Sequence, residues 1–149
     1  VILVMAGLLA GVGSLATSLW LSFGRRPVAR PGLVALVAAA GLHGLQVAYS
    51  WAQSLVPSLL LLVAIGAVGM AFSIAHSSLF LMAPPDGLRG RILGLQSLMI
   101  GTYPLSSLLV GWLGNQMGVL AAVRAVALSG FVWVALLAVA VPQLRRRVG

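Results

Sequence analysis

Four long stretches without a charged side chain constrain this chain more than any other feature of its sequence. They cover residues 1–24, 31–85, 92–123 and 125–144, which is 24, 55, 32 and 20 residues in order. About 20 apolar residues cross the hydrocarbon core of a bilayer as a helix, and lipid offers backbone polar groups no partners outside a helix or a closed barrel. The stretches therefore predict one, two, one and one spans, in an all-α integral membrane protein with five transmembrane helices.

Arginine, proline and glycine residues mark where these spans end. We expect a single membrane domain over residues 1–149, with spans at about 1–23, 32–52, 58–82, 92–114 and 119–141. Pro84 and Pro85 prevent helical continuation after the third span, and Gln53–Pro57 and Gly114–Gly118 are uncharged turns. Pro104 removes a hydrogen bond inside the fourth span, which predicts a kink there.

The positive charge of the chain is concentrated in the segments that follow particular spans. Net charge is +8, from nine arginines and one acidic residue, Asp86. Eight arginines follow the first, third and fifth spans, and only Arg124 belongs to the other side, near enough to the start of its span to snorkel to the interface. This predicts a multi-pass cell-membrane protein with its amino end outside and with residues 24–31, 83–91 and 142–149 in the cytoplasm. Arginines spread over connectors also argue against a nucleic-acid partner, and leave membrane lipid as the expected surroundings.

Small and polar residues align at helical spacing in the first, third and fourth spans. The aligned sets are Gly7, Gly11, Ser14 and Ser18; then Gly66, Gly69, Ser73, His76 and Ser77; then Gln96, Tyr103 and Ser107. Such stripes either let helices pack closely or line a path for a substrate, and both interpretations stay open. An ionisable side chain within a span is a functional hypothesis by default, so His76 leads the set. The substrate-path candidates are Ser14, Ser18, Ser73, His76, Ser77, Gln96, Tyr103 and Ser107.

The composition argues against an enzyme. With no cysteine and a single acidic residue, the chain has no pair of carboxylates, no thiolate ligands and no cysteine nucleophile. At 1.5 Å per residue, His43 and His76 lie at depths in the membrane that differ by roughly 15 Å, too far to share a metal ion. We therefore expect no catalytic residue, no metal site and no cofactor. A structural or assembly membrane subunit, or an inert truncated relic, is the alternative to a transporter.

Two motifs resemble the major facilitator superfamily, in particular its drug, macrolide and siderophore exporter branch. One is the loop Pro85–Ile92 entering Leu93–Leu98, and the other is a small-residue span that closes on Gly24-Arg25-Arg26. The whole chain is similar to the last five of twelve helices in such an exporter. The superfamily also has a longer loop signature, of which this sequence keeps only Gly24, Arg25 and Arg26. Thr17 and Leu21 occupy its other two positions.

The resemblance carries further expectations. It implies an incomplete C-terminal half of a major facilitator fold, which exports an unidentified small molecule by alternating access together with a missing N-terminal half. The first, third and fourth spans would then line the transport cavity, with the second and fifth peripheral. The cytoplasmic loop motif would comprise Asp86, Arg89, Gly90 and Arg91.

Overall fold

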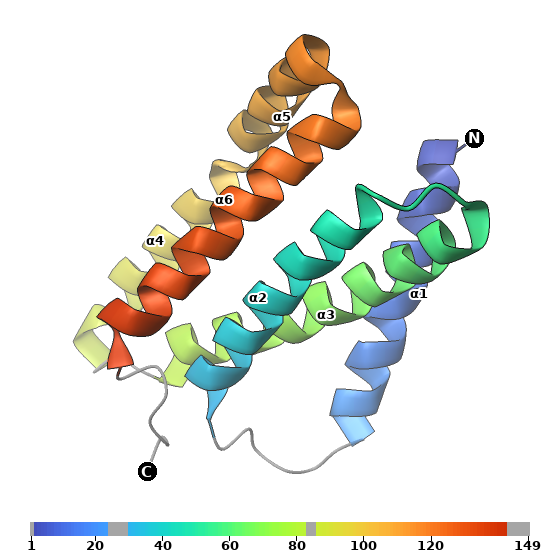
Figure 1. Ribbon diagram of the computed structural model, residues 1–149. Coiled ribbons are helices and arrows are strands. Elements are labelled where there is room, and N and C mark those ends of the chain that lie inside the picture. Colours follow the sequence, from blue (N-terminus) through green and yellow to red (C-terminus); the bar gives the residue numbers. More distant parts are fainter. Residues whose placement is uncertain (1, 24–29, 83–85, 143–149) are drawn as a thin grey trace.

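The computed structural model describes residues 2–23, 30–82 and 86–142, and they are almost entirely helical (Figure 1). The helices are α1 (Ile2–Phe23), α2 (Pro31–Tyr49), α3 (Leu55–Met82), α4 (Arg89–Gly101), α5 (Tyr103–Met117) and α6 (Val119–Ala140), and Asp86–Leu88 form one turn of 3₁₀ helix, η1. The predicted all-α class is confirmed.

Four stretches within the described residues are long and apolar enough to cross a membrane. They are Pro31–Tyr49, Leu55–Phe80, Gly90–Met117 and Val119–Ala140, and they correspond to the second to fifth predicted spans. The first predicted span corresponds to α1, in which Gly7–Phe23 is apolar. The chain thus has the composition of a multi-pass membrane protein.

The predicted turns at 53–57 and 114–118 are shorter in the structure, because the neighbouring helices α3 and α5 extend into them. α3 starts at Leu55, and Pro57 lies in its first turn, where a missing N–H costs nothing. α5 runs to Met117, and the chain reverses at Gly118 alone, whose φ of 85° favours glycine. α4 likewise starts at Arg89, so the expected loop 83–91 overlaps the first helical turn.

The fourth predicted span is interrupted near Pro104, as its sequence predicts. Because proline has no N–H, the carbonyl of Ile100 loses the partner it would have four residues on. The interruption falls at Thr102, between α4 and α5. There the backbone N–H of Thr102 donates to the Leu98 carbonyl over 3.1 Å, and its Oγ1 donates to the Met99 carbonyl over 2.7 Å.

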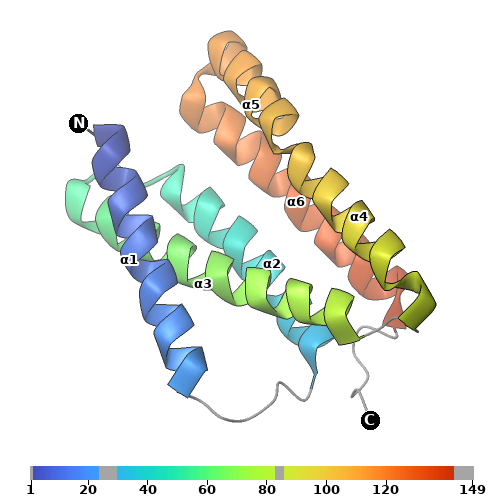
Figure 2. The same ribbon diagram turned by 180° about the vertical axis from the view of Figure 1, so that it is seen from behind.

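The helices follow one another across the bundle from α1 at one edge to α4 and α5 at the other. α1 packs on α3, α3 on α2, α2 on α6, and α6 on α5. Figure 2 shows the same order from behind, with α1 on the far side of α3 from α4. The carboxyl ends of α1, α3 and α6 and the amino ends of α2 and α4 lie at one end of the bundle (Figure 1).

The backbones of α1 and α3 come into direct contact. A Cβ atom at Gly13 would clash with the carbonyl of Val63 and lie 2.9 Å from the Ala67 nitrogen, and a Cβ at Gly66 would clash with Ala10. Ser14 Oγ lies 3.0 Å from the carbonyl oxygen of Gly66 on α3 and 3.0 Å from that of Ala10 on its own helix. Ser14 is therefore a packing residue of this crossing.

Two of the glycines expected to make such an approach, Gly7 and Gly11 on α1, do not make it. A Cβ on either would meet nothing within 4 Å, whereas Gly13 and two members of the predicted stripes, Ser14 and Gly66, lie at the crossing. On α1 the close contact is thus at Gly13 and Ser14. The backbone of α3 at Val63 and Ala67 lies so close to α1 that only glycine fits at position 13.

Arg124 joins the start of α6 to the end of α2. Its Nε donates to Ser50 Oγ over 3.1 Å, and its Nη2 donates to the Ser50 carbonyl over 3.3 Å. The guanidinium carbon lies 4.9 Å from the centre of the Trp51 ring, within reach of a cation–π interaction. Ser50 is only 3% exposed. The lone arginine at this end of the bundle is therefore held by protein groups, and does not simply extend to the interface.

Candidate functional site

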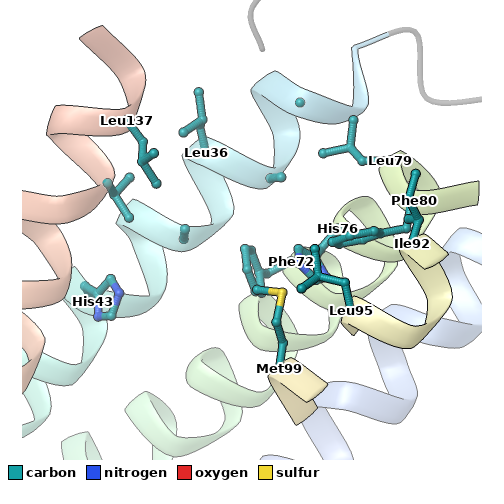
Figure 3. Close-up of a pocket in the computed structure, with 14 residues that line it drawn as sticks. Leu36, His43, Phe72, His76, Leu79, Phe80, Ile92, Leu95, Met99 and Leu137 are labelled. Carbon is teal, nitrogen blue, oxygen red and sulfur yellow. The ribbon is translucent and has the colours of Figure 1, made fainter. Parts of the chain in front are cut away.

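One pocket of about 590 Å³ opens between α2, α3, α4 and α6 (Figure 3). This volume lies within the usual range for small-molecule sites, roughly 300–1,000 Å³. Most of the lining is aliphatic or aromatic, and the polar side chains in it are two histidines. The lining residues are Gly32, Ala35, Leu36, Ala39, His43, Phe72, His76, Leu79, Phe80, Ile92, Leu95, Met99, Val134 and Leu137.

His76 lies at the centre of an aromatic row on α3. It is stacked on Phe72, with ring centroids 5.4 Å apart and planes at 27°, and it meets Phe80 edge to face at 4.7 Å. The spacing i, i+4, i+8 places the three rings on one helix face. Within the described residues His76 makes no hydrogen bond, and no buried side-chain nitrogen or oxygen lacks a partner. Its ring nitrogens are therefore not sealed in the protein, and are accessible from the pocket.

His43 enters the pocket from α2 and is held by its own helix. Its Nδ1 lies 3.3 Å from Gln46 Oε1, within hydrogen-bonding distance. The ring also rests on Gly130 of α6, where any Cβ would clash with it. Sequence reasoning placed the two histidines at different depths, but both line the same pocket, on walls formed by different helices (Figure 3).

The wall contributed by α4 is apolar. Ile92, Leu95 and Met99 recur at i, i+3 and i+7 and face the pocket. The sequence instead predicts that the face of the fourth span with Gln96, Tyr103 and Ser107 lines a substrate path. The aliphatic stripe has helical spacing in the sequence, but nothing distinguishes it there from a lipid-facing surface.

Of the seven substrate-path candidates whose side chains the structure describes, only His76 lines the pocket. Ser14 packs between α1 and α3, and Ser18 is half-buried on α1, where its carbonyl accepts a 2.7 Å hydrogen bond from Ser22. Ser73 and Ser107 are exposed, and Ser77 and Gln96 are half-buried away from the lining. The side chain of Tyr103 lies outside the described part of the structure.

The loop-motif residues lie at the start of α4. Gly90 and Arg91 are exposed in its first turn, and a Cβ on Gly90 would meet nothing within 4 Å. The backbone of Asp86 belongs to η1 and that of Arg89 begins α4, while the side chains of both residues lie outside the described part. The Gly24-Arg25-Arg26 motif also lies outside it.

The helices around this pocket differ from those expected to line a cavity. α2 and α6, expected to be peripheral, provide seven of the fourteen lining residues, which are Gly32, Ala35, Leu36, Ala39, His43, Val134 and Leu137. The described side chains of α1 provide none, because α1 packs on the side of α3 that faces away from α4 (Figure 2). Because α2 and α6 are almost entirely apolar, their sequences do not indicate that they line a pocket.

The chemistry available in the pocket is binding by contact and hydrogen bonding. The described lining residues include no carboxylate, and the chain has a single acidic residue, Asp86. Within the described residues, no three histidine, cysteine, aspartate or glutamate side chains are placed to hold a metal ion. The pocket therefore suits a largely apolar molecule with a hydrogen-bonding group near His76.

Comparison with known proteins assigns the chain to no family. No protein-family model, curated protein or solved structure matches it.

Proposed function

We propose that the chain is the C-terminal membrane part of a secondary transporter, an exporter of small molecules of the major facilitator type. The observation that carries this proposal is the pocket between α2, α3, α4 and α6, which combines the volume of a ligand site with an unpaired histidine inside an apolar bundle. The motif at 85–98 and the Gly24-Arg25-Arg26 motif support the choice of superfamily by resemblance.

A broken helix next to the pocket is compatible with a transport site. The break is at Thr102, since α4, which carries the pocket wall of Ile92, Leu95 and Met99, ends three residues before Pro104. Transporters of this type rock two halves against each other around a site near the midplane. In this proposal, further helices outside the chain form the second half and complete the translocation path.

A structural or assembly subunit is the second candidate, and a specific contact favours it. Ser14, expected to face a substrate, is instead bound to the Gly66 carbonyl at a helix crossing. If the other polar residues had the same role, the pocket would hold only lipid chains and no transport activity would depend on it.

Topology gives the first test. The described arginines Arg30 and Arg91 lie at the end of the bundle where α2 and α4 begin, and Arg124 lies near the other end. The positive-inside rule then places the carboxyl end in the cytoplasm. We expect a reporter fused after Gly149 to be active only in the cytoplasm and one inserted at Gln53 only outside, measured by paired alkaline phosphatase and fluorescent protein fusions. The reverse pattern at either site would refute the orientation.

Export gives the second test, in the complete transporter. His76→Phe keeps the aromatic row with Phe72 and Phe80 but removes the ring nitrogens. Because one hydrogen bond is worth about 1 kcal/mol, we expect the initial rate of substrate efflux from loaded vesicles to fall about fivefold, with unchanged protein level. Ser73→Ala, one turn away on the exposed side of α3, is the matched control and should retain the rate. Equal rates in both variants would favour the structural subunit.

A further inference from the structure

We infer that the pocket binds an uncharged lipophilic molecule that carries a hydroxyl or carbonyl group, and that it discriminates against lipophilic ions of either sign. This assignment rests on the proposed function, because it names the class of substrate for the same site. It follows from the charges, the hydrogen bonding and the shape of the lining.

Among the described residues, the lining offers no counter-ion. The fourteen lining residues include neither a carboxylate nor an arginine. Arg124 is already bound to Ser50 and Trp51, and Arg30 and Arg91 are exposed at the start of their helices. Moving an ion from water into apolar surroundings without a partner costs far more than moving a neutral group.

Aromatic faces do not replace the missing carboxylate. Cages for organic cations present open ring faces to the charge. Here Phe72 stacks on His76 and Phe80 meets the same ring edge to face, so the three rings are engaged with one another. They form an aromatic wall whose rings contact one another, which suits a ring-containing ligand better than a quaternary ammonium group.

His76 supplies the polar recognition. A polar group removed from water without a partner costs about 1–3 kcal/mol, and that cost is relieved when a ligand donates to or accepts from it. His43 contributes less to this recognition, because its Nδ1 lies 3.3 Å from Gln46 Oε1 and its ring lies on Gly130, which leaves only Nε2. With His76 as the main polar group, an apolar chamber of about 590 Å³ therefore selects a mostly hydrocarbon ligand with one polar group.

The test uses four probes that share one fluorescent body: 1-butylpyrene, 1-pyrenebutanol, 1-pyrenebutanoate and pyrenebutyl-trimethylammonium. The full chain is reconstituted into lipid nanodiscs at neutral pH, and saturable binding is measured by energy transfer from its tryptophans, with partition into empty nanodiscs subtracted. We expect the alcohol to bind about fivefold more tightly than the hydrocarbon, which corresponds to one hydrogen bond. We expect both ions to bind at least about tenfold more weakly than the alcohol.

Three variants assign the binding to the pocket. His76→Phe should bring the alcohol to the affinity of the hydrocarbon, Ser73→Ala should change neither, and Ala39→Trp should abolish saturable binding by filling the chamber from α2. If Ala39→Trp lowers the yield of folded protein, Leu95→Trp fills the pocket from α4 instead. Tighter binding of either ion, or full binding in both filled variants, would overturn the inference.

The outcome separates this inference from the proposed function. If the protein in nanodiscs prefers an ion but efflux still depends on His76, the proposed transport function stands and the proposed substrate class is refuted. The expected preference for the alcohol, with no efflux by the complete protein, would leave the binding site and refute the transporter.

Discussion

Gly13→Leu should separate α1 from α3 and leave little folded protein, whereas Gly11→Leu, two positions earlier on the same helix, should be tolerated. Any side chain at Gly13 would overlap the Val63 carbonyl and approach the Ala67 nitrogen, and neither backbone atom can move aside without displacing α3. Overpacking in a well-packed region costs about 1–3 kcal/mol, and a backbone obstacle places this substitution at about 3 kcal/mol or more. At Gly11 nothing lies within 4 Å of the added Cβ.

The measurement is the fraction of monodisperse protein in mild detergent, together with unfolding in increasing SDS followed by circular dichroism. Gly66→Leu should reproduce the loss from the other side of the crossing, since its Cβ would clash with Ala10. The substitution also displaces the Gly66 carbonyl from Ser14 Oγ. Equal stability of the Gly13 and Gly11 variants would contradict the close contact of the two helices.

The class of the fold and most spans follow from the sequence because the bilayer fixes them. A run of about 20 uncharged apolar residues has few alternatives to a transmembrane helix, so 58–82 and 119–141 predict α3 and α6 to within a few residues. The interruption in the fourth span is also predictable, since proline at 104 removes a specific hydrogen bond.

Element ends and helix faces are less predictable. Asn115, Gln116 and Met117 are polar or flexible in sequence, but nothing stops the helix before Gly118, where the backbone adopts a positive φ. Helical spacing groups Gly7, Gly11 and Ser14 on one face of α1. Which of these residues contact α3 depends on how the two helices cross, and the close contact is at Gly13 and Ser14.

The same distinction applies to the pocket. An ionisable residue within a span stands out, so His76 could be predicted from the sequence as a site residue. His43 stands out less because α2 is otherwise mostly aliphatic, and the aliphatic residues of α2, α4 and α6 carry no signal of their own. In lipid, a hydrophobic stripe is equally compatible with lipid contact, helix packing and a ligand pocket, and only the spatial arrangement separates the three.

Arg124→Gln is expected to destabilise the contact between α2 and α6 by about 2 kcal/mol. The substitution removes two hydrogen bonds from a charged donor to Ser50, at 3.1 Å and 3.3 Å, and the contact with the Trp51 ring. Arg124→Lys keeps the charge but loses the planar fork that reaches Oγ and the carbonyl together, so we expect it to recover less than half of the loss. Arg91→Gln is the matched control, because Arg91 is exposed on α4.

A double-mutant cycle distinguishes this clamp from a simple charge effect. Ser50 Oγ also donates to the Val47 carbonyl over 2.7 Å, so Ser50→Ala carries a cost of its own in addition to the bond with Arg124. If Arg124 and Ser50 act as a pair, the loss of stability in the double variant, measured by unfolding in SDS, should be about 1 kcal/mol smaller than the sum of the two single losses. Strictly additive losses, or an equal loss for Arg91→Gln, would show that Arg124 acts through its charge at the membrane interface and does not hold α6 to α2.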